Sequence, residues 1–413
     1  MPISIIILFA VFALIAVRHI GRFRFQIWHV MLGGALAVLL TGQISAENAI
    51  LSINLDVIFF LFGMFVVGEA LEESGYLAHL SFKVFKRSEN TGQLVLLLIC
   101  AVGFFSTFLM NDTLAIIGTP LVLGFSKKHN ISAKMLLLAL AFSVTIGSVM
   151  SPIGNPQNLL VAIDGGIQNQ FVTFFVYLAI PTIINFGVIY LLLRLYYRKE
   201  FTDKKIIHED EPVKDKKLSL LCKVSLILIL ILVAAKIISV LIGVGEEFRL
   251  TYIALIAAAP ILIVSEKRFS VLKNVDWPTL VFFAAMFVLM ASVWESNFFQ
   301  NLIADMNLDI TAIPVILLLG ILLSQLISNV PMVALTLPLL MSAGVATSGL
   351  MALAAGSTIA GNMLILGAAS DVIIIQNAEK RGETLTFWEF ARIGIPLTII
   401  NALIYWLFLT ALN

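Results

Sequence analysis

The stretch GQLVLLLICAVGFFSTFLMNDTLAIIGTPLVLGF, residues 92–125, decides the fold, because it is strongly apolar but broken by Asn-Asp-Thr at 111–113. A membrane crossing needs about 20 residues, so the stretch is too long for one helix and too short for two crossings with a loop. Basic residues at 83–87 and 127–134 flank it, and Lys and Arg favour the cytoplasmic side. The stretch therefore starts and ends inside, as a re-entrant hairpin or as two short helices with a tight turn.

A second stretch, residues 311–345, has the same length problem and is broken by Ser-Asn-Val-Pro at 328–331. The loops on either side of it, 295–310 and 346–349, contain no Lys or Arg. This stretch therefore begins and ends outside. The sequence predicts one hairpin entering the membrane from each face.

The composition of the whole chain agrees with a membrane location. Of 413 residues, 60% are apolar and only 12% are charged, and the net charge is +1. The mean hydropathy is +1.03. Soluble domains carry about 25% charged residues. Too little polar surface is present for a soluble enzyme, a nucleic-acid-binding protein or a disordered chain, so a polytopic membrane protein remains.

The first apolar run, residues 3–17, could be the core of a signal peptide, but the basic residues Arg18, Arg22 and Arg24 follow it rather than precede it. We therefore expect a membrane helix that enters from outside. Each further crossing is an apolar segment, and together they give about ten transmembrane helices in an all-α fold: 26–41, 53–71, 135–163, 171–193, 218–242, 250–264, 278–294, 350–376 and 390–412. The basic loops then place both termini outside, in the cytoplasmic membrane of a prokaryote.

Residues 198–217 form the only strongly charged run, which predicts a cytoplasmic linker between membrane halves 1–197 and 218–413. The halves echo each other in order: Met64 corresponds to Met286, Asn111 to Asn329, and Gly154 to Gly367. With the deduced topology, these matches predict an inverted repeat, a plan that is common in secondary transporters.

Two of the predicted spans, 135–163 and 350–376, are interrupted at corresponding positions. The first contains Ser-Pro-Ile-Gly-Asn-Pro-Gln-Asn at 151–158, and the second is rich in small and polar residues over 361–371. Irregular backbone survives in a membrane only where it lines a cavity, so matched breaks predict a site at mid-membrane. The alternative is a pair of kinks repaired by neighbouring helices. The residues expected at the site are Ser151, Gly154, Asn155, Asn158, Asn362, Gly367, Ser370 and Asp371.

Two carboxylates complete this prediction. Asp112 lies at the first hairpin tip, and a carboxylate inside a membrane is a functional candidate by default. It repels an anion unless it is protonated or holds Na⁺, so we expect it to bind the coupling ion. Asp371, the repeat mate of Asn158, supplies either a second ion-binding carboxylate or a helix cap. A Na⁺ ion would have Asn111, Asp112, Asn329 and Asp371 as its candidate ligands.

Four motifs of the chain, in their order, resemble those of the ion transporter superfamily. They are FLMNDTLAIIGTPLVL, SPIGNPQNLL, LISNVPMVALTLPLL and GNMLILGAASDVII. The likeness is to the ArsB/NhaD permease branch with its citrate-transporter-like domain, related to divalent anion:sodium symporters, and it spans essentially the whole chain. It implies a dimeric scaffold, a transport domain that moves as an elevator, and a site between tips and breaks. That site comprises the 154–158 and 367–371 loops together with Asn111, Asp112, Thr113, Ser328 and Asn329.

The chain departs from the sodium–dicarboxylate pattern, in which both tips carry Ser-Asn-Thr. Val330 removes a hydroxyl that could bind a substrate carboxylate, and Asp112 adds a negative charge. Both changes weaken the case for citrate or succinate and favour proton coupling or cation exchange. We predict a secondary transporter for a small anion or oxyanion, dicarboxylate-like or arsenite-like, coupled to H⁺ or Na⁺. The alternative is a Na⁺/H⁺ antiporter.

Other classes fit the sequence less well. A channel predicts a continuous polar lining, and an enzyme predicts a nucleophile–base pair or a metal cluster, neither of which is visible. The chain contains no P-loop, and Cys100 and Cys222 lack metal-ligand spacing. We therefore expect no enzyme activity and no cofactor beyond the coupling ion. The expected partners are the small-molecule substrate, membrane lipid and a second copy of the chain, with an ATPase subunit as an open alternative and no nucleic acid.

Overall fold

The computed structural model describes residues 2–17, 19–20, 23–24, 26–76, 79–80, 88–201, 214–242, 248–299, 301 and 309–412. Within these ranges the chain is almost entirely helical, and its only strands are the two-residue β1 (His19–Ile20) and β2 (Phe23–Arg24). The predicted helical fold class is confirmed. Most of the expected cytoplasmic linker, residues 202–213, lies outside the described residues.

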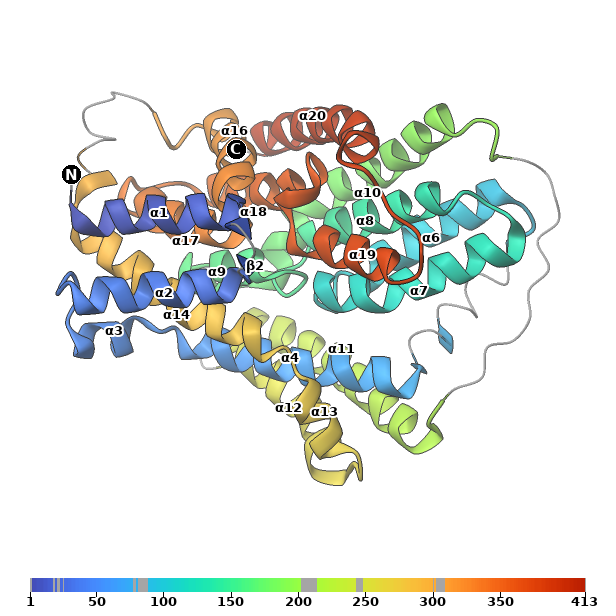
Figure 1. The fold of residues 1–413 in the computed structure, drawn as a ribbon, viewed down its shortest axis with the longest axis horizontal. Coiled ribbons are helices and arrows are strands. Elements are labelled where there is room, and N and C mark those ends of the chain that lie inside the picture. Colours follow the sequence, from blue (N-terminus) through green and yellow to red (C-terminus); the bar gives the residue numbers. More distant parts are fainter. Residues whose placement is uncertain are drawn as a thin grey trace.

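The helices fall into two packing groups, which we call body A and body B (Figure 1). Within body A, α4 packs along α12, and α2 packs along α14. A side chain at Gly63 of α4 would lie 2.7 Å from the Ala254 carbonyl of α12, so the close approach requires glycine. Body A contains α1 (Ile3–Val17), α2 (Ile27–Leu40), α3 (Ala46–Ser52), α4 (Leu55–Ser74), α11 (Lys216–Leu241), α12 (Leu250–Val264), α13 (Arg268–Asn274) and α14 (Trp277–Glu295).

Body B holds both predicted hairpins and both predicted breaks. Its first set of elements is α6 (Thr91–Phe105), α7 (Asn111–His129), α8 (Ala133–Val149), α9 (Pro156–Asp164) and α10 (Gln170–Tyr196). Its second set is α16 (Ile313–Ile327), α17 (Asn329–Ser342), α18 (Thr347–Ile359), η2 (Ala360–Asn362), η3 (Ile365–Gly367), α19 (Ala369–Glu379) and α20 (Phe387–Ala411). The α6–α7 and α16–α17 hairpins approach the middle of the molecule from opposite ends (Figure 1).

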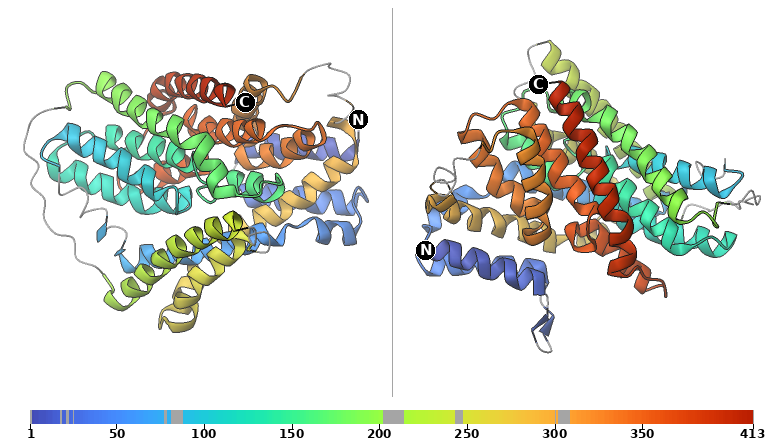
Figure 2. Two further views of the ribbon diagram at one scale, coloured as in Figure 1. Left: turned by 180° about the vertical axis from the view of Figure 1, so that it is seen from behind. Right: turned by 90° about the horizontal axis from the view of Figure 1, so that it is seen from above.

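The centre of body B is formed by α8 and α18, which pack against each other. Nearly every residue of both helices is buried, which explains why their sequences are apolar on all sides. The two longest helices of body B, α10 and α20, lie side by side across this centre (Figure 2). Hairpins and breaks are therefore held against a rigid, buried core.

Four described helices are long and apolar enough to cross a membrane singly: α10, α11, α14 and α20. The pair α3 and α4 also qualifies as one span with a 50° bend. Several other apolar helices have 14 to 17 residues, such as α2 and α8, and at 1.5 Å per residue they span about 21 to 26 Å, less than the bilayer core. The chain is an integral membrane protein, in which the shorter helices include the hairpin arms and broken halves.

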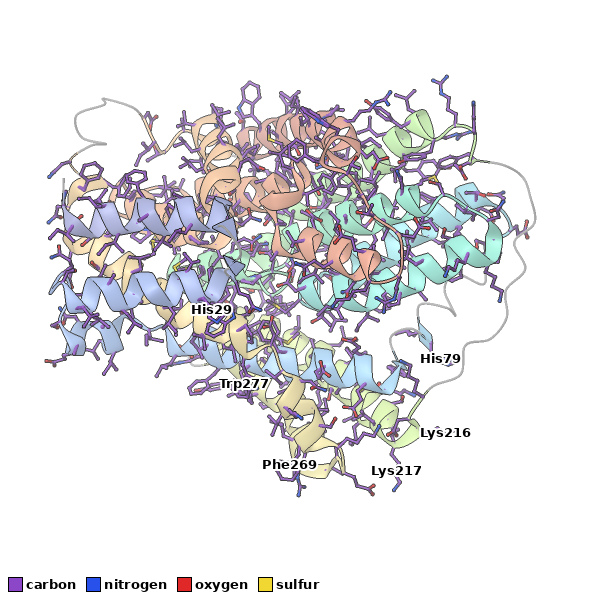
Figure 3. All side chains as sticks on the ribbon, in the orientation of Figure 1. His29, His79, Lys216, Lys217, Phe269 and Trp277 are labelled. Carbon is purple, nitrogen blue, oxygen red and sulfur yellow. The ribbon has the colours of Figure 1, made fainter. Side chains whose placement is uncertain are left out.

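Two short helices lie in segments that the sequence predicts as loops. They are α3, within 42–52, and α13, between the spans 250–264 and 278–294. Each leads directly into a long helix of body A, and both have seven residues, too few to give a periodic signal. The exposed side chains of Phe269 in α13 and Trp277 at the start of α14 lie on the surface of body A (Figure 3).

Ion pairs join the helices of body A at both ends of α4. At one end Arg249 Nη1 lies 3.0 Å from Asp56 Oδ2. At the other end Lys267 Nζ lies 3.1 Å from Asp215 Oδ2 and 3.4 Å from Glu73 Oε1. The hydrogen bond from the Leu218 backbone amide, and after it the Lys267 ammonium, lower the pKa of the Asp215 carboxyl. These contacts fix α4 between α11, α12 and α13.

Candidate functional site

The tip of the first hairpin touches the first break directly. α6 ends at Phe105 and α7 begins at Asn111, whose backbone amide donates to the Gly154 carbonyl at 3.0 Å. The Ser151 hydroxyl donates to the Thr107 carbonyl at 2.6 Å. A side chain at Gly154 would lie 2.7 Å from the Ser106 carbonyl oxygen, so glycine is needed here for the tip to approach.

One amide side chain provides most of the hydrogen bonds to the backbone carbonyls of the first break. Asn158 is fully buried in the first turn of α9. Its Nδ2 donates to the carbonyls of Ser148, Val149 and Ser151 at 3.0, 3.1 and 3.0 Å. These carbonyls lie at and just beyond the end of α8, where the helix itself provides no donors. Asn158 therefore holds the broken backbone together.

The neighbouring Asn155 has a similar structural task. Its Oδ1 accepts the Asn158 backbone amide at 2.8 Å and so caps α9. Its Nδ2 donates to Ser148 Oγ at 2.8 Å and to Thr358 Oγ1 at 3.3 Å. Thr358 in turn donates to Asn158 Oδ1 at 3.1 Å, which joins the first break to α18 of the second half. The amide groups of Asn155 and Asn158, both predicted site residues, thus have protein partners.

The second hairpin is joined to the second break by Gln325. α16 ends at Ile327, Ser328 adopts a positive φ of 70°, and α17 begins at Asn329. One turn before the tip, Gln325 Nε2 donates to the Ala360 carbonyl at 2.7 Å. A side chain at Gly367 would lie 2.8 Å from that same carbonyl oxygen. Tip and break are again in contact, as in the first half.

The second break differs from the first because its polar side chains lack protein partners. Asn362, Ser370 and Asp371 are all buried. In the described structure, the polar side-chain atoms of these three residues have no hydrogen-bond partner. They are both amide atoms of Asn362, the hydroxyl of Ser370 and both carboxyl oxygens of Asp371. A buried polar atom without a partner costs about 1–3 kcal/mol, so such a group marks a place where water, an ion or a substrate binds.

More partnerless atoms extend this set into neighbouring helices. Asn329 Oδ1 belongs to the second tip, Gln325 Oε1 and Ser324 Oγ to α16, and Thr145 Oγ1 to α8. Of these, Asn329 was predicted from the sequence, whereas Thr145, Ser324 and Gln325 were not. The available signal was weak: each is a polar residue within an otherwise apolar helix.

Asp112 and Asp371 lie on neighbouring helices although 258 residues separate them in the chain. Asp112 is the second residue of α7 and Asp371 the third of α19, and these two helices pack against each other. The charge of Asp112 acts electrostatically on Asp371. Two nearby carboxylates in a poorly solvated place do not both carry charge without a proton or a cation between them. Helix N-termini offset part of this negative charge.

Each hairpin packs on the broken helix of the other half. α7 lies along α19, and α17 lies along α9. Side chains from both halves therefore surround the same central region, and neither half forms it alone.

The remaining predicted site residues lie at its edges. Thr113 faces body A, because a side chain at Gly68 of α4 would lie 2.6 Å from Thr113 Oγ1. Ser151 is occupied by its bond to Thr107. Gly154 and Gly367 contribute close backbone packing rather than a side chain. Among the described residues, no group of three or more His, Cys, Asp or Glu side chains could hold a metal ion.

Comparison with known proteins agrees with this architecture. The profile of the citrate transporter family, CitMHS, matches residues 10–349. A 46 kDa membrane protein of Mycobacterium leprae is 27% identical, over 97% of this chain and 96% of that protein. The silicon efflux transporter LSI3 of Oryza sativa is 26% identical over 89% of each chain.

The fold has a counterpart among solved structures. The YdaH transporter of Alcanivorax borkumensis superposes with a TM-score of 0.60 over 99% of this chain and 97% of that chain, at 16% sequence identity. Identity this low concerns the fold alone. From the family match and the transporters among its relatives, the chain is a membrane transporter rather than an enzyme, and it belongs to the citrate transporter family.

Proposed function

We propose that this protein is a secondary active transporter that moves a small anion or oxyanion in exchange for, or together with, H⁺ or Na⁺. One observation carries the proposal: Asp112 and Asp371 lie on the packed helices α7 and α19 of the two halves, and Asp371 belongs to a set of buried polar groups that have no partner among the described residues. A transport site must be polar, buried and able to give up its ligand, and these atoms meet those conditions.

The absence of basic residues at the tips and breaks supports a narrower substrate class. The tips and breaks, residues 106–113, 150–158, 325–331 and 360–371, contain no Lys, Arg or His. An anion would be bound by the Asn362 amide and by helix N-termini, with Asp112 and Asp371 neutralised by the coupling ion. This favours a protonated or singly charged oxyanion over a multiply charged carboxylate such as citrate. The silicon transporter among the relatives agrees with that preference.

We further infer that the chain is an inverted repeat of two halves, 1–197 and 218–413. The α3 and α13 helices begin 222 residues apart, at Ala46 and Arg268, and both have seven residues. The α6 and α16 helices also begin 222 residues apart, at Thr91 and Ile313, and both have 15 residues. Packing partners correspond as well: α2 with α14 matches α12 with α4, and α7 with α19 matches α17 with α9.

The repeat supports a multi-pass topology with both termini outside. Lys216 and Lys217 lie in the same half of the molecule as the ends of α6 and α7 that are remote from their hairpin tip (Figure 3). Basic residues favour the cytoplasm, so this half is expected on the cytoplasmic side. Figure 1 shows the N-terminus and the C-terminus in the opposite half. In the cytoplasmic membrane of a prokaryote, this arrangement would place the α16–α17 hairpin on the external side.

An elevator mechanism follows if body A is a fixed scaffold and body B moves. Each body contains helices of both halves, and the bodies meet mainly along α4, α14 and α1. The polar groups of the site belong to body B, so they would travel together with the substrate. A homodimer through body A would anchor the scaffold against this movement.

The test is a transport panel in proteoliposomes. Uptake of oxyanions and carboxylates is measured with and without Na⁺, at two pH values, together with liposomes that lack protein. We expect at least one oxyanion to be accumulated with a dependence on the pH gradient or on Na⁺. Accumulation that ignores both gradients would contradict the proposal.

The second candidate, a Na⁺/H⁺ antiporter, is favoured by the same two carboxylates, because acids in tip and break segments that contain no Lys, Arg or His also suit cation exchange. The two functions are separated by adding Na⁺ to proteoliposomes that hold a pH gradient and no added anion. The antiporter would dissipate the gradient, whereas the anion transporter would leave it until its substrate is supplied.

A further inference from the structure

The sequence Thr-Ile-Ile-Asn occurs twice, once in each of the two longest helices of body B. It occupies residues 182–185 in α10 and residues 398–401 in α20. The two helices pack against each other, and the last residues of the two motifs meet there. Asn401 Nδ2 donates to Asn185 Oδ1 at 2.7 Å. Two residues at matching places in a repeated motif are therefore joined across the boundary between the halves.

A second hydrogen bond joins the same two helices one turn further along α20. The hydroxyl oxygens of Thr182 and Tyr405 lie 2.6 Å apart. All four side chains, which are those of Thr182, Asn185, Asn401 and Tyr405, are fully buried inside two helices that are long and apolar enough to cross the membrane. Polar side chains in such a place bind across helices rather than to water. These two bonds fix α20 against α10.

Stability alone does not explain the asparagine pair. Asn185 Nδ2 and Asn401 Oδ1 are buried and have no hydrogen-bond partner among the described residues. The net gain from one hydrogen bond is smaller than the cost of two buried polar atoms without partners, so two apolar side chains of similar shape would hold the helices together at least as well. A buried amide provides a fixed register between helices instead, as a single buried Asn does in coiled coils.

The register of α20 matters because α20 touches the second break. A side chain at Gly394 would collide with the carbonyl oxygen of Asn362, so the helix and the break are in direct contact. Gly394 precedes Asn401 by seven residues, which is about two helical turns, so both residues lie on the same face of α20. A shift of α20 along or around its axis would therefore displace the backbone of Asn362.

We propose that Asn185 and Asn401 are positioning residues of the substrate site, which fix the register of α20 and thereby hold Asn362 where its amide can reach the substrate. The inference rests on the proposed function, in which Asn362 binds the substrate. The side chain of Asn362 has no hydrogen-bond partner among the described residues, so its place depends on how its backbone is packed. The Thr182–Tyr405 bond supports the same register.

The test is hydrogen–deuterium exchange of the full-length protein in nanodiscs, without substrate. The variant combines Asn185→Leu with Asn401→Leu, which removes the polar atoms of the pair and keeps the approximate side-chain shape. We expect an equal or higher melting temperature, because no buried polar atom is left without a partner. Backbone amides of the second break, residues 360–371, should exchange about fivefold faster, the factor that corresponds to one hydrogen bond. Exchange in the first break, residues 150–158, should not change.

Two further variants show whether the effect comes from the contact between the helices. Thr398→Val is the matched control, because Thr398 is buried on the same face of α20 but donates to the Gly394 carbonyl of its own helix at 2.9 Å. It should keep wild-type exchange in both breaks. Tyr405→Phe removes only the bond to Thr182 and should give a smaller increase in residues 360–371.

Wild-type exchange of residues 360–371 in the folded leucine pair overturns the inference. An equal increase in the first break, or in Thr398→Val, also overturns it, because the loosening would then be general. If the leucine pair does not fold, wild-type exchange in Tyr405→Phe overturns the inference. None of these results depends on the transport panel, and a panel without gradient-driven accumulation would refute the proposed function while leaving the exchange pattern intact.

Discussion

The two breaks occupy corresponding positions in the two halves but treat their polar groups in opposite ways. In the first break, Asn158 bonds three carbonyls, and Asn155 caps the helix that follows. In the second break, Asn362, Ser370 and Asp371 are equally buried, but within the described part of the chain their polar side-chain atoms have no hydrogen-bond partner. The polar side chains of the first break are hydrogen-bonded within the protein, whereas those of the second break would gain hydrogen bonds only from a bound ligand.

If the two halves are the repeat proposed above, this difference means that the repeat has kept its backbone geometry more closely than its function. Asn158 and Asp371 correspond in the proposed repeat, yet Asn158 bonds backbone carbonyls, whereas the Asp371 carboxyl has no hydrogen-bond partner among the described residues. We infer that the first half supplies a rigid wall and Asp112, and that the second half supplies most of the ligand-binding groups. Variants that separate stability from transport can test this division.

The largest effect is expected from Asp371→Asn, which removes the charge of the second break and keeps its shape. Because its oxygens have no protein partner, the free energy of unfolding should change little. Loss of a charged contact to the coupling ion costs about 3 kcal/mol, so gradient-driven accumulation should fall roughly 100-fold. Substrate exchange without a gradient should persist, because it needs no cycling of the ion. Wild-type accumulation would refute the assignment.

Asn158→Ala should have a large effect on stability. It removes the Nδ2 donor to three buried carbonyls and the acceptor of the Thr358 hydroxyl, although the Ser148 carbonyl and Thr358 keep hydrogen bonds from Asn155. At about 1 kcal/mol for each lost bond, the free energy of unfolding should fall by about 2–4 kcal/mol. Chemical unfolding in detergent measures this. Asn362→Ala is the matched variant in the second break, and it should leave stability within about 1 kcal/mol while weakening substrate binding. Equal losses of stability would contradict the comparison.

A smaller effect separates the two serines of the breaks. Ser151→Ala loses its bond to the Thr107 carbonyl and should cost about 1 kcal/mol. Ser370→Ala loses no protein bond and should be neutral or stabilising in the absence of substrate. The melting temperature of each variant, measured without ligand, is the readout, and a reversed order would count against the account.

The smallest effect concerns an ion pair far from both breaks, which serves as a reference. Glu389 bonds Lys134 and caps α20, so the Lys134 ammonium and the Thr386 amide lower the pKa of the Glu389 carboxyl. A lowered folded-state pKa gives stability that is present above about pH 4.3 and is lost as pH falls further. Glu389→Gln should therefore cost about 0.5–1 kcal/mol at pH 7 and almost nothing near pH 3. A loss that is the same at both pH values would exclude the pair as its cause.

Much of the fold follows from local sequence. The predicted polar tips at Asn111 and Asn329 are the first residues of α7 and α17, so the polar interruption of each apolar stretch marks the point where a new helix begins. The break at 151–155 lies between α8 and α9, where the proline at 156 starts a helix but cannot continue one. Such boundaries depend on residues near in sequence.

The roles within the site depend on distant residues and could not be predicted in this way. Asn158 looks like a ligand donor until the carbonyls at the end of α8 and the Thr358 hydroxyl are placed around it. Gln325 shows its importance only when Ala360, 35 residues away, lies within hydrogen-bond distance. The same holds for the division into bodies, since each body mixes helices from both halves.

The central claim is that Asp112 and Asp371 carry the coupling ion for the substrate that binds beside them. The direct measurement is the simultaneous flux of substrate and of H⁺ or Na⁺ in proteoliposomes, for the wild type and for Asp112→Asn and Asp371→Asn. We predict a fixed ratio of ion to substrate in the wild type and substrate exchange without ion flux in both variants. An unchanged ratio in either variant would contradict the account.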